Sequence, residues 1–304
     1  MTRISIFLNL VRLNFLPASV FPFILGAALA YNRGYPVTSL NFFLALIGVA
    51  SAHLASNAVN NYSDHASGAD GPDTVTTPFF GGTKVLIEGK VSPIVCRAWA
   101  IFFGLAAVFA GAVLFFITKY PILIFMTFFG ALLGAQYSAG PLRFSYRGMG
   151  EAVIFILFGP LLVMGSYYLF SGHFSLESFL LSLIPGTLIF SVIVFNEIPD
   201  VVTDRKAGKN NLVVMMGKGK GRLLCLTGVC LSSFFLAWGV LSKALPLLAG
   251  FALIFYPMAI FAMKILFTRQ DDVLEMTKGG MLLVMTHSLV TVSIAATLIY
   301  CRLK

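Results

Sequence analysis

The chain has 304 residues, of which 58% are hydrophobic and 11% charged, and its mean hydropathy is +0.91. Soluble globular domains carry about a quarter charged residues, so this composition excludes a soluble protein and predicts an integral membrane protein. The net charge of +9 is assigned to basic loops that fix topology. Binding to nucleic acid is excluded, because no basic segment interleaved with aromatic residues occurs.

Nine apolar segments can be drawn as membrane-spanning helices, each of about 20 residues. Barrel strands are excluded because these segments lack alternation of polar and apolar residues. The shortest segment is bounded by Pro121 and by a Gly140-Pro141 turn. We therefore predict an all-α bundle of nine transmembrane helices that forms one domain over residues 1–304. The segments are 14–31, 39–61, 94–118, 121–138, 149–171, 176–199, 222–242, 244–267 and 279–301.

The basic residues divide unevenly between the two ends of these nine segments. Sixteen Lys and Arg residues fall at the end that carries the N-terminus, and five fall at the other end. Loops rich in Lys and Arg stay in the cytoplasm, so the N-terminus is predicted to be cytoplasmic in a cell inner or plasma membrane. The connections after the second and sixth segments, 62–93 and 200–221, then form cytoplasmic caps.

A polar cluster lies at the end of the second segment. Its members are spaced by four, three and four residues, so on a helix they share one face, which must point into the protein interior or a water-filled cavity. Asn60 and Asp64 are candidates for ligand binding, and a turn-rich loop is suited to bring Asp70 beside them. For His53 we favour an interhelical hydrogen bond. The face is formed by His53, Asn57, Asn60 and Asp64.

A second cluster lies at the end of the sixth segment and has the same geometry. Asn196, Asp200 and Asp204 follow one another at intervals of four residues, which again places them on one helix face. Pro199 lies among them, and we expect it to kink or end the helix because proline cannot donate the backbone hydrogen bond.

Carboxylates on two facing helix ends are ligands of the kind that Mg²⁺ prefers, together with phosphate oxygens and water. Zinc is disfavoured because neither the histidines nor the four cysteines show metal-ligand spacing. Basic side chains near the clusters can neutralise a diphosphate. The candidates are Lys84, Arg143 and Lys209. An ion-coupled transporter remains an alternative, although its carboxylates should lie near the middle of the membrane.

The two clusters resemble the paired aspartate-rich motifs of the UbiA superfamily of intramembrane prenyltransferases. The run Asn60-Asn61-Tyr62-Ser63-Asp64, with Gly68 and Asp70, is similar to the variant of the branch that prenylates 1,4-dihydroxy-2-naphthoate for menaquinone. The stretch from Asn196 to Asp204 and on through Lys209 is close to the second motif of that branch. Asn61 departs from the pattern, which usually has Asp there, so the site lacks one negative charge.

The resemblance implies a UbiA-type bundle that transfers a polyprenyl group from an isoprenoid diphosphate to an aromatic acceptor within membrane lipid. It implies Mg²⁺ held by Asp64, Asp70, Asp200 and Asp204, with Asn60 and Asn196 completing the catalytic set. It further implies diphosphate binding by Lys84, Arg143 and Lys209.

The resemblance favours 1,4-dihydroxy-2-naphthoate as the acceptor and leaves the oligomeric state open. The alternative acceptors are 4-hydroxybenzoate, homogentisate, a tetrapyrrole and a glyceryl-phosphate lipid.

Overall fold

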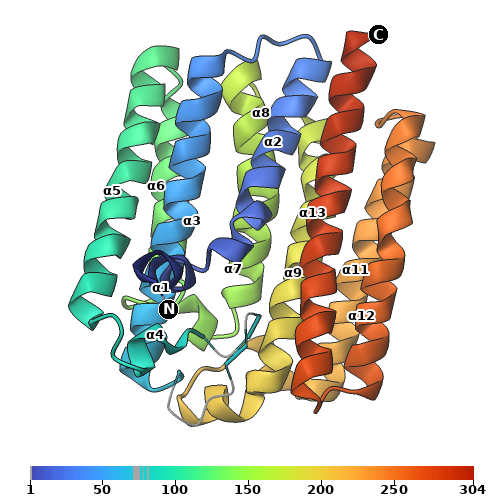
Figure 1. Cartoon of the computed structure of the whole chain (residues 1–304). Coiled ribbons are helices and arrows are strands. Elements are labelled where there is room, and N and C mark those ends of the chain that lie inside the picture. The colour runs from blue at the N-terminus through green and yellow to red at the C-terminus, as the bar shows by residue number, and fades with distance from the viewer. Residues whose placement is uncertain (1, 71–75, 78, 81) are drawn as a thin grey trace.

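The fold is known from a computed structural model, which describes residues 2–70, 76–77, 79–80 and 82–304. The described part is a bundle of long helices (Figure 1). Two 3₁₀ turns are also present, η1 (Leu13–Phe15) and η2 (Phe144–Tyr146). The helices are α1 (Arg3–Leu10), α2 (Pro17–Asn32), α3 (Ser39–Ser67), α4 (Lys84–Ile87), α5 (Pro93–Thr118), α6 (Pro121–Gln136), α7 (Gly150–Ile156), the π-helix η3 (Leu157–Leu161), α8 (Leu162–Ser171), α9 (Leu176–Lys206), α10 (Leu212–Met216), α11 (Lys218–Leu241), the 3₁₀-helix η4 (Leu247–Phe255), α12 (Tyr256–Thr268) and α13 (Val273–Leu303).

Eight of these helical segments are long and apolar enough to cross a membrane, and the protein is a multi-pass membrane protein. The remaining predicted segment, 121–138, forms α6, an apolar helix of 16 residues beside α5. This is shorter than the about 20 residues that a membrane-spanning helix needs. The all-helical class is confirmed for the described residues, whereas the count of nine spans is not.

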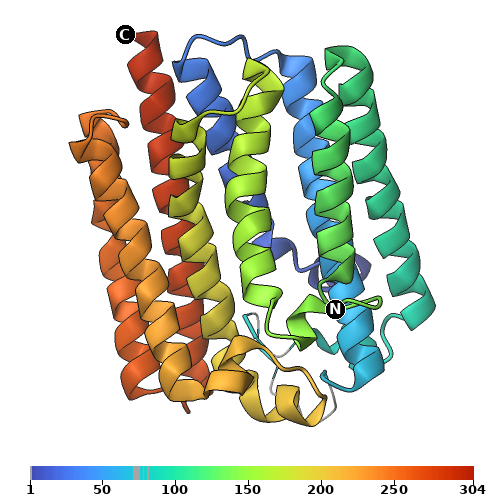
Figure 2. The same ribbon diagram turned by 180° about the vertical axis from the view of Figure 1, so that it is seen from behind.

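The long helices form a closed ring in which neighbours in the chain are mostly neighbours in space. Helix α3 packs between α2 and α5, α6 continues the ring toward η3 and α8, and α9 packs between α8 and α11. Helix α12 packs between α11 and α13, and α13 closes the ring against α2. Figure 2, from behind, shows α7 and α8 (yellow-green) standing between the green helices α5 and α6 on one side and α9 (yellow) on the other.

Large apolar side chains cover the outside of the ring, as expected for a surface that faces lipid. On α5, Phe102, Phe109 and Phe116 are exposed, and on α6 Phe125 and Phe128 are exposed. Because water cannot solvate so large an apolar surface favourably, this pattern supports the assignment to the membrane.

The helices that carry the polar clusters are longer than the sequence predicted. Helix α3 runs on to Ser67, so the whole run from Asn60 to Asp64 is helical. Helix α9 passes through Pro199 and ends at Lys206, so Pro199 does not end the helix. Buried neighbours such as Ile198 and Val201 hold this part of α9 in the core, which offsets the one backbone hydrogen bond that proline cannot make.

The ends of α3 and α9 lie together at one end of the bundle, the lower end in Figure 1. The short helices α4 and α10 lie in the segments that follow them. The fold therefore brings two regions about 140 residues apart in the sequence to one place.

A close approach between α2 and α8 depends on Gly26. A Cβ atom built there would lie 2.2 Å from the Val163 carbonyl oxygen and 2.8 Å from Ser166 Cβ. We expect Gly26→Ala to lower the free energy of unfolding in detergent micelles by about 1–3 kcal/mol, because backbone atoms must move apart. The matched control is Gly104→Ala on α5, where no atom lies within 4 Å of the added Cβ. Equal stability of the two variants in thermal unfolding would contradict this packing.

Candidate active site

A cavity runs from the lower end of the bundle up between the helices. Its walls come from α2, α3, α5, α6, α9 and the α7–η3–α8 segment, while α11 to α13 contribute none of its lining. The upper part is lined by small and apolar side chains, such as those of Gly48, Gly111, Leu114 and Leu123. The lower part is polar and is lined by Asn60, Asp64, Asp70, Asp200, Asp204 and Lys209.

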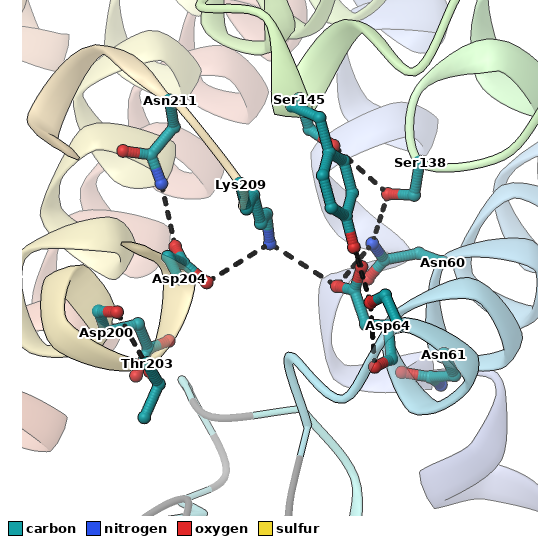
Figure 3. A network of polar contacts seen from close by, with 12 residues as sticks. Asn60, Asn61, Asp64, Ser138, Ser145, Asp200, Thr203, Asp204, Lys209 and Asn211 are labelled. Carbon is teal, nitrogen blue, oxygen red and sulfur yellow. Dashed lines mark hydrogen bonds and ion pairs between the residues drawn. The ribbon is translucent and has the colours of Figure 1, made fainter. Parts of the chain in front are cut away.

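Lys209 joins the two acidic clusters. Its Nζ lies 3.4 Å from Asp64 Oδ2 and 3.7 Å from Asp204 Oδ1, and Figure 3 shows it between these two carboxylates. Burial lowers the pKa of Lys209, but the neighbouring carboxylates Asp64 and Asp204 outweigh burial and raise this pKa well above its ordinary value. The lysine is therefore a permanent cation at neutral pH.

Asp64 is held by side chains from the segment between α6 and α7. The Tyr146 hydroxyl donates to Asp64 Oδ1 at 3.2 Å. Asn60 Nδ2 donates to Asp64 Oδ2 at 3.0 Å and to Ser138 Oγ at 2.6 Å, as Figure 3 shows. Burial, and then the charge of Asp64, raise the pKa of Tyr146, so this phenol remains a neutral donor.

Asp70 reaches the site through a turn. Gly68 ends α3 with a φ of 79°, a conformation that glycine adopts without a steric cost. The chain then folds back, and the Asp70 backbone N–H donates to the Asp64 carbonyl oxygen at 3.2 Å. Burial raises the pKa of Asp70, and the charge of Asp64 raises it further. A cation bound between these groups would favour their ionised forms.

Asp204 is held by the segment between α9 and α11. Asn211 Nδ2 donates to Asp204 Oδ2 at 2.7 Å, while Asn211 Oδ1 accepts the Val214 N–H at 2.8 Å and caps α10. The backbone N–H of Leu212 donates to the buried carboxylate of Glu151 on α7. These contacts fix the loop that carries Lys209.

The loops that support the two clusters also bond to each other. Asn210 N–H donates to the Tyr146 carbonyl oxygen at 3.3 Å, which forms an isolated bridge between Arg147 and Asn210. The segment between α6 and α7 therefore supports Asp64 on one side and the Lys209 loop on the other. No role for Tyr146, Glu151 or Asn211 was predicted from the sequence.

Arg12 is a further cation at the cavity that sequence analysis assigned only to topology. It lines the cavity and has a φ of 47°, which is uncommon for a residue with a side chain. Its Nε donates to Asn61 Oδ1 at 2.9 Å, and Asn61 Nδ2 donates to the Leu10 carbonyl oxygen at 2.6 Å. The amide at position 61, where the family pattern has Asp, thus tethers the Arg12 segment to α3.

Some of the other predicted site residues line the cavity and some do not. Asn196 and Asp200 line the cavity, in agreement with their predicted position on one face of α9. Lys84 is exposed at the start of α4 and is not among the lining residues. Arg143 is also outside the lining, and its guanidinium stacks 3.6 Å from the ring centre of Tyr146, so it reaches Asp64 only through that tyrosine.

The donor chemistry at the lower end fits a hard cation. Carboxylate and amide oxygens from both clusters face one cavity, which suits Mg²⁺. Within the described ranges, however, no three His, Cys, Asp or Glu side chains gather closely enough to form a complete set of metal ligands. Lys209 lies between Asp64 and Asp204 instead.

Residues 19–301 match the UbiA prenyltransferase family. The chain belongs to this family. It is therefore a prenyltransferase, as the resemblance of its motifs predicted. It is 29% identical to a protein of Escherichia coli K12 named 1,4-dihydroxy-2-naphthoate octaprenyltransferase, over 81% of this chain and 83% of that one.

Solved structures of UbiA homologues share the fold. A UbiA homologue from Aeropyrum pernix, solved without ligand, superimposes with a TM-score of 0.72 at 15% identity, over 91% of this chain and 97% of that one. A UbiA homologue from Archaeoglobus fulgidus superimposes with a TM-score of 0.61 at 16% identity, over 95% and 99%. The latter structure is bound to GPP and Mg²⁺, which shows that a UbiA fold can bind an isoprenoid diphosphate with a divalent metal.

The two roles of Asn211 lead to a prediction. Asn211→Ala leaves the buried Asp204 without its donor and α10 without its cap, so we expect the free energy of unfolding to fall by about 1–3 kcal/mol. Amide hydrogen exchange in α10 should also become faster. The adjacent Asn210→Ala is the matched control, since Asn210 is exposed and, among the residues that the structure describes, its side chain bonds only the Gly208 carbonyl oxygen, at 3.4 Å. Equal effects of the two variants would contradict the role of Asn211.

Proposed function

We propose that this protein transfers a polyprenyl group from an isoprenoid diphosphate to 1,4-dihydroxy-2-naphthoate, in menaquinone biosynthesis. The observation that carries this proposal is one cavity that joins a carboxylate-rich end to a long apolar end. A diphosphate with a long hydrocarbon tail has these same two parts. The name of the Escherichia coli relative supports naphthoate as the acceptor.

The lower end is assigned to the diphosphate and Mg²⁺. Asp64, Asp70, Asp200 and Asp204 would hold the metal through their carboxylates. When bound, Mg²⁺ neutralises charge on the departing diphosphate, which lowers the barrier to breaking the allylic C–O bond. Asn60 and Asn196, on the same cavity wall, are suited to orient phosphate oxygens or water.

Two cations of the chain complete this end. Lys209 and Arg12 line the cavity, so both can approach the diphosphate as negative charge develops on it. Of the three cations suggested by the sequence, we retain Lys209, because Lys84 and Arg143 lie outside the lining. Binding of the diphosphate would draw Lys209 from the carboxylates toward phosphate oxygens.

The upper end is assigned to the prenyl tail and the aromatic ring. The apolar wall between α5, α6 and α8 can hold the hydrocarbon tail, and Phe15, Tyr137 and Phe158 line the cavity nearer the carboxylates. Their ring faces can stabilise an allylic carbocation and exclude water until the electron-rich acceptor attacks it. In this proposal residues 1–304 act as a single domain.

The metal assignment is tested by activity. We expect Asp64→Asn to lower Mg²⁺-dependent transfer from a prenyl diphosphate to 1,4-dihydroxy-2-naphthoate by about 100-fold or more, because it removes one charge of the metal site. Asp271→Asn is the control, since Asp271 is exposed and distant from the cavity lining. Full activity of Asp64→Asn, or of the wild type in EDTA, would contradict the assignment. If the wild type transfers the prenyl group only to another acceptor, the assignment of 1,4-dihydroxy-2-naphthoate is wrong.

The proposed topology has nine spans, with the N-terminus and both supporting loops in the cytoplasm, because most basic residues fall at that end. In a variant of the protein whose four native cysteines have been replaced, Arg33→Cys should react with a membrane-impermeant maleimide added to intact cells. Lys206→Cys should react only after the cells are opened, because it lies at the other end of the bundle. The reverse labelling pattern would invert the proposed orientation.

A further inference from the structure

A histidine in the middle of the cavity makes only half of its possible hydrogen bonds. His53 Nδ1 lies 2.6 Å from Ser19 Oγ, which is the interhelical bond expected from the sequence. Within the described part of the chain, His53 Nε2 has no hydrogen-bond partner, although the residue is only 7% exposed. Leaving a buried polar atom without a partner is unfavourable, so a ligand that pairs with it binds more tightly.

Which nitrogen of His53 carries the proton depends on whether the Ser19 hydroxyl donates or accepts in its bond to Nδ1. Among the bonds of the described residues, this hydroxyl has His53 Nδ1 as its sole side-chain partner. If Ser19 donates to Nδ1, the proton of the neutral imidazole lies on Nε2, which becomes a donor. Both residues line the cavity, so this donor belongs to the cavity wall.

His53 lies deeper in the membrane than the diphosphate end. At 1.5 Å per helical residue, it lies about 10 Å above Asn60 and about 16 Å above Asp64 along α3. By the same measure Asn196 lies about 12 Å above Asp204 on α9. His53 therefore lies deeper than Asn60 and Asn196, the residues assigned to the phosphate oxygens, on the part of the cavity wall next to the diphosphate end.

The apolar tail does not account for this polar group. A polyprenyl chain has no atom that can accept a hydrogen bond, and the wall between α5, α6 and α8 already offers it an apolar path. His53 is on α3, and its ring packs edge-on against Phe158, with ring centres 5.7 Å apart, in the π-helix η3. Single-turn π-helices occur often at functional sites. An oxygen of the aromatic acceptor is the remaining partner.

We propose that His53, held by Ser19, binds the aromatic acceptor by donating a hydrogen bond from Nε2 to an oxygen substituent of its ring. This inference rests on the proposed prenyl transfer and assigns the acceptor to the wall formed by α2, α3 and η3. There, one edge of the ring is anchored by His53 and the other faces the diphosphate end. His53 is thus a residue that orients the acceptor.

The test separates the two substrates. His53→Phe keeps a planar ring against Phe158 but removes the donor, so we expect the KM for 1,4-dihydroxy-2-naphthoate to rise about tenfold, the effect of losing one hydrogen bond. The KM for the prenyl diphosphate should change by less than about twofold. His53→Gln, which offers an amide N–H, should restore part of the lost affinity. If His53→Phe folds poorly, the double variant Ser19→Ala/His53→Phe is measured in its place. It also removes the Ser19 hydroxyl, which His53→Phe leaves buried without its partner.

The matched control is His287→Phe on α13. His287 is buried as well, and neither of its ring nitrogens has a partner among the described residues, but it does not line the cavity. This variant should leave the KM for the acceptor unchanged. An equal rise in this KM for both variants would indicate a general effect of losing a buried histidine and would overturn the inference.

Acceptor analogues test the contact itself. 1-Hydroxy-2-naphthoate lacks one hydroxyl, and 1,4-dihydroxynaphthalene lacks the carboxylate. With the analogue that lacks the bonded oxygen, wild type and His53→Phe should have the same KM, whereas the other analogue should retain the tenfold difference. An equal tenfold difference with every acceptor would assign the bond to the 1-hydroxyl oxygen, which all three compounds share. Absence of any transfer by the wild type would overturn the proposed function as well, whereas active wild type with an unchanged KM in His53→Phe would overturn this inference alone.

Discussion

The ion pairs between Lys209 and the carboxylates of Asp64 and Asp204 connect the separate parts of the site. A charge buried without a partner is very costly, so the ends of α3 and α9 can bring their carboxylates together only if a cation lies between them. The Lys209 side chain meets this requirement in the structure. A metal with a diphosphate would meet it during the reaction, so binding exchanges one neutralising partner for another.

The surrounding loops follow from the same constraint. Lys209 can bridge the clusters only if its loop is fixed, and Asn211 and Glu151 fix it through side-chain and backbone bonds. Tyr146 contributes a donor to Asp64, and its backbone bonds the Lys209 loop. The segment between α6 and α7, which has few charged residues, is therefore as much part of the site as the acidic motifs.

The cavity combines two environments that a water-soluble enzyme would have difficulty joining. Its lower end has the charges that a diphosphate needs, and its upper end has the apolar wall that a polyprenyl tail needs. Above the carboxylates, the pair formed by Ser19 and His53 is a polar point on the cavity wall. Such a point inside a membrane is costly unless it serves a ligand, and this cost makes His53 a stronger candidate than its position in the sequence suggested.

The sequence alone determined the membrane class, the helical architecture and the two acidic faces, because these depend on composition and on the helical period of 3.6 residues. It also placed Asn196 and Asp200 correctly on one face of α9. Only the tertiary structure decided which cations reach the cavity, since Lys209 and Arg12 do so while Lys84 does not. That choice depends on loop conformation and on contacts between distant segments, such as the bond from Arg12 to Asn61, which no local pattern records.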